Sequence, residues 1–137
     1  MLTSCSNQED AERFRLRAVT MPNGETVYAE MAIDTAEMMR GMMFRDSLAA
    51  DRGMFFVHNK MGRYSYWMYQ VRIPLDIIWI DQQKNVVEVL ATVPPCPSTK
   101  SSECPTHGGT KDAQYVLELA AGMAAKYGVT VGSKIDF

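Results

Sequence analysis

Short segments in which apolar and polar residues alternate, separated by turn-forming residues, recur along this chain and limit its fold more than any other feature. Residues 13–18 alternate between arginines and apolar side chains, and residues 27–33 alternate between apolar and polar ones. This is the period-two pattern of a half-exposed strand. Pro22-Asn23-Gly24 stands between the two segments and is typical of a turn. We therefore expect a β-hairpin over residues 13–33.

Further strands and two short helices are expected downstream. Asp34-Thr35-Ala36-Glu37 resembles a capping box and predicts a short helix to about Met43. A second short helix is expected at 121–127, where Gly128 suits the residue that ends a helix. The remaining apolar segments predict strands at 53–58, 64–70, 76–81, 86–92, 115–119 and 131–137. The predicted fold class is mostly β (α+β): a single-domain antiparallel β-sandwich or open barrel of about seven strands, with two short marginal helices.

Composition excludes several broad classes of protein. The chain has 137 residues, of which 47% are apolar and 22% charged, so it is not wholly disordered. No run of 18 apolar residues is present, so no transmembrane helix is expected. A net charge of −2 without a basic block argues against nucleic acid as a partner. We expect one domain at residues 13–137, preceded by a flexible N-terminal tether at residues 1–12.

The N-terminal residues bear on the compartment. Leu2-Thr3-Ser4-Cys5 resembles the end of a bacterial lipoprotein signal, although no charged or apolar region precedes it. Either the sequence is a truncated lipoprotein that is lipidated at Cys5, or the match is accidental. The first alternative predicts a protein of the bacterial cell envelope, periplasmic or secreted, that meets a membrane only through a lipid on Cys5.

Two other cysteines, Cys96 and Cys104, lie among prolines in a stretch without apolar periodicity at residues 93–113. A disulfide between them would close a loop of about nine residues and contribute about 2.6 kcal/mol. Such a bond is typical of an oxidising compartment. Free thiols are one alternative. A metal site of Cys96, Cys104 and His107 is the other, although it lacks a C-x2-C pair and an obvious fourth ligand.

Several ordered motifs carry a resemblance to a known family. They are Arg40-Gly41-Met42-Met43-Phe44-Arg45, Gly53-Met54-Phe55-Phe56-Val57, Tyr66-Trp67-Met68, the segment 73–81, Val93-Pro94-Pro95-Cys96-Pro97 with Cys104-Pro105, and the segment 115–122. Together they resemble the domain of unknown function 192 (DUF192) family over roughly residues 27–137. The resemblance implies a compact, mostly-β domain that is often exported or envelope-associated, and it supplies no catalytic residues. The chain departs from the usual family pattern at 69–71 and in the turn at 82–85.

Four residues in these motifs are candidates for a ligand site: Arg40, Arg45, Trp67 and Asp76. An arginine can bind a carboxylate or phosphate through two hydrogen bonds, and a tryptophan face offers stacking. If they converge in a cleft, they suit a small anionic or sugar-like ligand. The alternative is structural: an arginine pairs with Asp76 to tie a helix to the sheet, and Trp67 belongs to the core.

The predicted function is a non-catalytic small-ligand-binding or accessory module, without a cofactor or metal, whose partner is an unknown small ligand or an envelope protein. One alternative is a hydrolase or transferase that uses His107 as a general base together with Asp76. Another is a copper-binding module, because soft thioethers bind Cu(I) and four methionines cluster at 38, 39, 42 and 43. A docking surface formed by the aromatic residues 64–69 is a further alternative.

Overall fold

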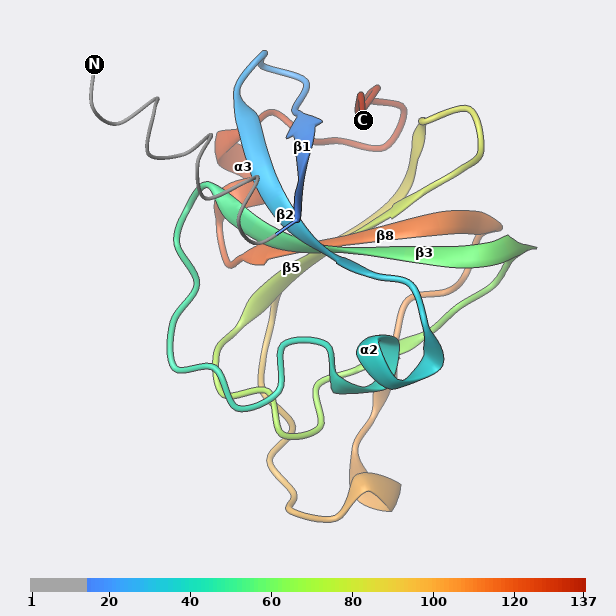
Figure 1. Ribbon diagram of the computed structural model, residues 1–137. Helices are drawn as coiled ribbons and strands as arrows, with labels where there is room; N and C mark the ends of the chain where they lie inside the picture. Colours follow the sequence, from blue (N-terminus) through green and yellow to red (C-terminus); the bar gives the residue numbers. More distant parts are fainter. Residues whose placement is uncertain (1–14) are drawn as a thin grey trace.

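The computed structural model describes residues 15–137, which form eight strands, two short α-helices and one 3-10 turn (Figure 1). In chain order these are β1 (Leu16–Thr20), β2 (Thr26–Ala32), α2 (Thr35–Arg40), β3 (Arg52–Gly62), β4 (Tyr66–Trp67), β5 (Leu75–Ile80), β6 (Val86–Val93), η1 (Ser101–Glu103), β7 (Thr106–His107), β8 (Ala113–Ala120) and α3 (Met123–Lys126).

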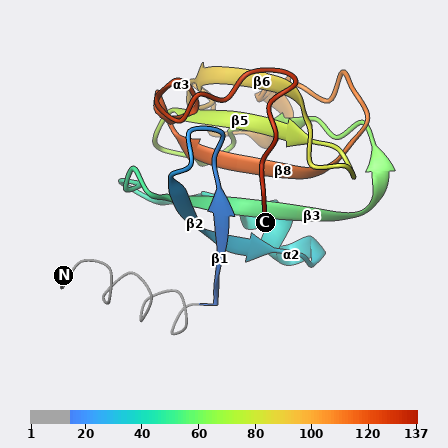
Figure 2. The ribbon, with the colours of Figure 1, turned by 90° about the horizontal axis from the view of Figure 1, so that it is seen from above.

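Six strands form one sheet in the order β1-β2-β3-β8-β5-β6 (Figure 2). β4 and β7 form a second, two-stranded sheet. The mostly-β prediction with two short helices is confirmed, and the described strands do not close into a barrel. One pair departs from the antiparallel expectation, since β2 and β3 run parallel. The chain between them, which includes α2, returns across one face of the sheet, as a parallel pair requires.

Each face of the large sheet is covered by its own apolar cluster. Along β5, Ile78 and Ile80 belong to the cluster beneath α3, whereas Ile77 and Trp79 belong to the cluster on the side of α2 and β4. Because successive side chains of a strand point to opposite faces, a fully buried strand such as β5 contributes to both clusters. Figure 1 shows α2 and α3 on opposite sides of the sheet.

The local signals in the sequence are formed as expected. β1–β2 and β5–β6 are antiparallel hairpins. Asp34 and Glu37 form both hydrogen bonds of a capping box at the start of α2. Gly128 follows α3 with a φ of +73°, which is the left-handed conformation that glycine adopts most readily after a helix.

Two predicted strands are shorter in the structure or absent from it. Residues 131–137 form only isolated bridges, Thr20 with Asp136 and Asn85 with Lys134. A turn closed by the Ser133 amide and the Thr130 carbonyl interrupts this segment. The expected strand at 64–70 is reduced to β4, because the chain turns immediately afterwards and Gln70 has a φ of +57°.

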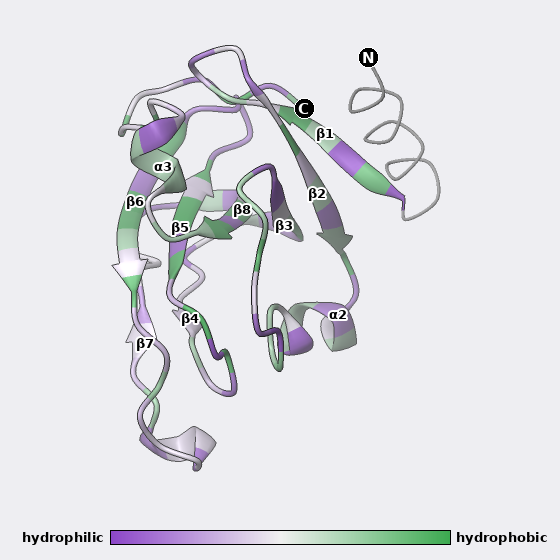
Figure 3. Ribbon diagram, turned by 90° about the vertical axis from the view of Figure 1, so that its left-hand side faces the viewer, coloured by the Kyte–Doolittle hydropathy of each residue, from purple (hydrophilic) through white to green (hydrophobic). Residues whose placement is uncertain are grey.

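The stretch at 93–113 contains η1 and β7, and it projects away from the large sheet (Figure 3). Cys96 and Cys104 lie at disulfide-bonding distance in it, with sulfur atoms 2.09 Å apart. β7 then returns beside β4, where Tyr66 pairs with His107. At Gly108 a Cβ atom would lie 2.2 Å from the Trp79 ring, so only glycine allows the chain to pass this close to the core.

Candidate functional site

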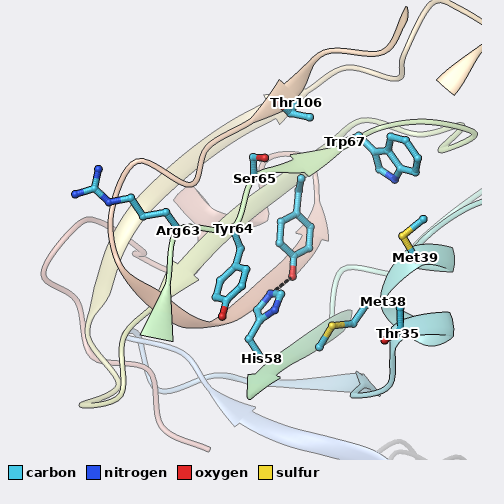
Figure 4. A pocket seen from close by; sticks show the side chains of 10 residues that line it. Thr35, Met38, Met39, His58, Arg63, Tyr64, Ser65, Trp67 and Thr106 are labelled. Atoms are coloured by element: carbon cyan, nitrogen blue, oxygen red, sulfur yellow. Dashed lines mark hydrogen bonds between the residues drawn. The ribbon is translucent and has the colours of Figure 1, made fainter. Parts of the chain in front are cut away.

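A cleft of about 540 Å³ opens between α2, the end of β3 and the β4–β7 pair (Figure 4). Its volume lies in the range that holds small organic ligands. The lining is mainly aromatic and thioether, with a few polar groups at the rim: Thr35, Met38, Met39, His58, Arg63, Tyr64, Ser65, Tyr66, Trp67 and Thr106. Met38 and Met39 project from α2 on one side, and Tyr64 and Trp67 come from the segment opposite (Figure 4).

Stacked rings hold the aromatic wall of the cleft in place. The rings of His58 and Tyr64 stack with centroids 3.6 Å apart, and His58 Nε2 lies 2.8 Å from the Tyr66 hydroxyl. Trp79 donates a hydrogen bond from Nε1 to the Tyr64 carbonyl at 2.7 Å, which ties this segment to the sheet. Burial lowers the pKa of His58, which favours its neutral form.

A side cavity of about 20 Å³ adjoins the cleft and reaches Glu118 on β8. The two spaces share four lining residues, namely Met38, Met39, Tyr66 and Trp67. The volume of the side cavity suffices for one water molecule or for a chemical group of that size. The Glu118 carboxyl group therefore lies at the inner end of the cleft system.

Glu118 is a buried carboxyl group without a hydrogen-bond partner. The residue is 4% exposed, and within residues 15–137 its oxygens accept no hydrogen bond. No fully buried side-chain oxygen of the described chain is left unpaired, so these oxygens must reach the surface of the side cavity. Burial raises the pKa of Glu118 to about 8, while the positive charge of Arg45 opposes part of that rise.

Arg45 lies near Glu118 but bonds to another residue. Glu30, Met54 and Glu118 occupy one row across β2, β3 and β8, so they share a face of the sheet. Arg45 binds both carboxylate oxygens of Glu30, in one case from Nη2 at 3.0 Å. The positive charge of Arg45 therefore acts on Glu118, although Arg45 donates no hydrogen bond to it.

The four residues expected to form a ligand site occupy three different environments. Arg40 and Trp67 line the side cavity, and Trp67 also lines the main cleft. Arg45 lines a separate space beside Glu30 and Arg52. Asp76 is fully buried on the opposite face of the sheet, where α3 packs. The structure therefore brings Arg40 and Trp67 together, and it places Arg45 and Asp76 elsewhere.

Asp76 has a structural environment that sequence reasoning did not foresee. Its oxygens accept hydrogen bonds from the backbone N–H groups of Thr92 and Ala124, each at 2.8 Å. The carboxyl group thus joins β5 to β6 and to α3. His107 lies in β7, on the other side of the sheet, so the geometry gives no support to a shared reaction centre of His107 and Asp76.

The methionine cluster mainly packs against the core. Met42 is 1% exposed, and Met38 packs against the apolar cluster on its side of the sheet. Met39 is 54% exposed at the mouth of the cleft. Among the described residues, no group of three or more His, Cys, Asp or Glu side chains is arranged to hold a metal ion.

Glu118 is the residue of this site that sequence reasoning missed. A signal was present, because Glu118 is the only charged residue in the otherwise apolar or uncharged strand β8. Lone charges in apolar strands also occur at sheet edges, and the central position of β8 could not be inferred from sequence.

Two sequence expectations concern the membrane. No helix of the described chain is long and apolar enough to cross a bilayer. Cys5 and the tether at residues 1–12 lie outside the described residues.

Comparisons with known proteins agree with this architecture. A crystal structure of a protein of unknown function from Novosphingobium aromaticivorans DSM 12444 has a TM-score of 0.75 and 30% identity, over 89% of this chain and 85% of that one. A candidate transcription regulator from Sinorhizobium meliloti 1021 also has a TM-score of 0.75, with 25% identity over 87% of this chain and 89% of that one.

No curated protein matches the chain. The profile of the DUF192 family, described as uncharacterized ACR, matches residues 18–137, which is nearly the whole of the described fold. The chain therefore belongs to the DUF192 family.

Proposed function

We propose that this domain is a non-catalytic binding module of the bacterial cell envelope, which holds a small and largely apolar ligand in the cleft between α2 and β4. The observation that carries the proposal is the cleft itself, with its volume of about 540 Å³ and its aromatic and thioether lining. Apolar walls with a few convergent polar groups are typical of ligand sites.

One wall of the cleft is held rigidly by the core, which supports the interpretation that the cleft is a binding site. Tyr66 contacts Phe56 and Trp79 edge-on, at centroid distances of 5.0 and 6.0 Å, so the core holds this ring in place. A preformed wall reduces the ordering that a ligand must impose. The opposite wall carries Met38 and Met39, whose flexible thioethers adapt to ligands of different shape.

Binding in the cleft predicts that Trp67→Ala weakens the affinity for an apolar probe by about tenfold, since aromatic residues dominate the energetics of such sites. The probe is the uncharged fluorophore prodan, which has no hydrogen-bond donor, and its emission reports the affinity. Phe44→Ala is the matched control, because Phe44 is 54% exposed and does not line the cleft. Equal losses in both variants, or no binding by the parent protein, would contradict the proposal.

The envelope location predicts an oxidised Cys96–Cys104 pair in the cell, because the two sulfur atoms already lie at bonding distance and disulfides persist in oxidising compartments. Intact-mass measurement of protein purified from its own cells, before and after reduction, should show a gain of two hydrogens. Two free thiols at these positions would contradict the location.

We do not propose nucleic acid as a partner, given the net charge of −2.

A further inference from the structure

We infer that the ligand of this cleft is an organic amine, bound with its ammonium group at Glu118 and its apolar body between α2 and β4. The inference rests on the proposed function, because it names the ligand class of the same cleft. Its starting point is the combination of a buried carboxyl group without a donor and a small space in front of that group.

Glu118 lacks a hydrogen-bond donor among the described residues. An ionised carboxylate only accepts hydrogen bonds, and the oxygens of Glu118 are left to whatever occupies the side cavity, whether water or a group of a ligand. Glu118 and Asp76 are the two buried charged residues of the described chain. Asp76 is satisfied by two backbone amides, whereas Glu118 has no hydrogen bond within residues 15–137.

Within residues 15–137, the two arginines beside the site do not donate to Glu118. Arg45 is held by both oxygens of Glu30. Arg40 lines the side cavity from α2 but is an exposed residue, so solvent screens its charge. The donor must therefore come from outside the described chain.

The size and the walls of the site favour an ammonium group. The side cavity of about 20 Å³ fits a group the size of a water molecule, and an ammonium group is of that size. The rings of Tyr66 and Trp67 line both the side cavity and the main cleft. Aromatic faces attract cations, so the same walls that accept an apolar body also favour a positive charge beside Glu118.

The test compares three ligands with the same phenylbutyl body: 4-phenylbutylamine, 4-phenylbutan-1-ol and 5-phenylpentanoate. Isothermal titration at about pH 8.5 should show the amine binding at least about tenfold more tightly than the alcohol, as expected for a charge-assisted hydrogen bond. Glu118→Gln should remove this preference. Glu25→Gln should keep it, because that substitution removes one exposed negative charge in the β1–β2 turn.

A pH series on the unaltered protein tests the inference without any variant. With the pKa of Glu118 at about 8, amine affinity should rise by about tenfold or more between about pH 6.5 and pH 8.5, because the ammonium group binds the ionised carboxylate. Alcohol affinity should stay constant. The other groups facing Glu118 do not produce this rise: an arginine side chain does not lose its proton in proteins, Glu30 is bound to Arg45, and burial raises the pKa of Tyr66. The pKa of His58 at the cleft wall is lowered.

Equal affinity for amine and alcohol, tightest binding of the phenylpentanoate, or a preference that persists in Glu118→Gln would overturn the inference. If prodan still binds in any of those cases, the proposed function stands. If neither prodan nor any of the three ligands binds, the proposed function fails, and the inference fails with it.

Discussion

Glu118→Gln is expected to remove most of the fall in stability that this protein should show between about pH 5 and pH 8. The pKa of Glu118 is about 8 in the folded protein, against an ordinary value of 4.5. Between these values the folded chain holds a proton that the unfolded chain has released, so stability falls as pH rises. Each pKa unit corresponds to about 1.4 kcal/mol, which gives a loss of roughly 3–5 kcal/mol by the time the folded carboxyl group also ionises.

Urea unfolding at a series of pH values measures this effect directly. With respect to this group, the unaltered protein should be most stable below about pH 4.5, whereas Glu118→Gln should have a flatter profile and be the more stable of the two at about pH 8. Glu25→Gln is the control for loss of one negative charge and should follow the unaltered protein. Parallel profiles for the unaltered protein and Glu118→Gln would show that the carboxyl group is not desolvated.

Asp76→Ala is expected to destabilise the fold by roughly 3–5 kcal/mol, since it leaves one buried and one partly buried backbone N–H group without an acceptor. These groups belong to Thr92 and Ala124, so the loss should be felt at both β6 and α3. Urea unfolding gives the size of the effect, and amide hydrogen exchange should show faster exchange at these two positions.

Asp81→Ala is the matched control for Asp76→Ala. Asp81 also accepts two backbone hydrogen bonds, from Gln83 and Asn85 at 2.9 Å, but it does so at a partly exposed turn where water can replace it. We expect Asp81→Ala to lower the free energy of unfolding by about 1 kcal/mol. Equal losses in the two variants would contradict the structural role of Asp76. Prodan binding by folded Asp76→Ala should persist, because Asp76 faces away from the cleft.

The local elements of this fold could be predicted because their causes are local. The turn at Pro22-Asn23-Gly24, the capping box at Asp34 and Glu37, and Gly128 after α3 each act within a few residues. The closeness of Cys96 and Cys104 belongs to the same class, since only a short loop separates them.

The features that needed the structure depend on contacts between distant residues. The parallel pairing of β2 with β3 follows from the path of the intervening chain across the sheet, which no strand pattern specifies. Glu118 lies in a central strand because β8 inserts between β3 and β5. Of the four candidate ligand-site residues, Arg45 and Asp76 lie on opposite faces of the sheet, since Arg45 binds Glu30 and Asp76 binds the start of α3.

The strand order also bears on how the chain folds during synthesis. β8, which begins at Ala113, separates β3 from β5, so the earlier strands form two blocks that lack a common neighbour until the ribosome has released most of the domain. Pairings of such high sequence separation form slowly. The six-stranded sheet therefore cannot be completed before residue 120 has been synthesised.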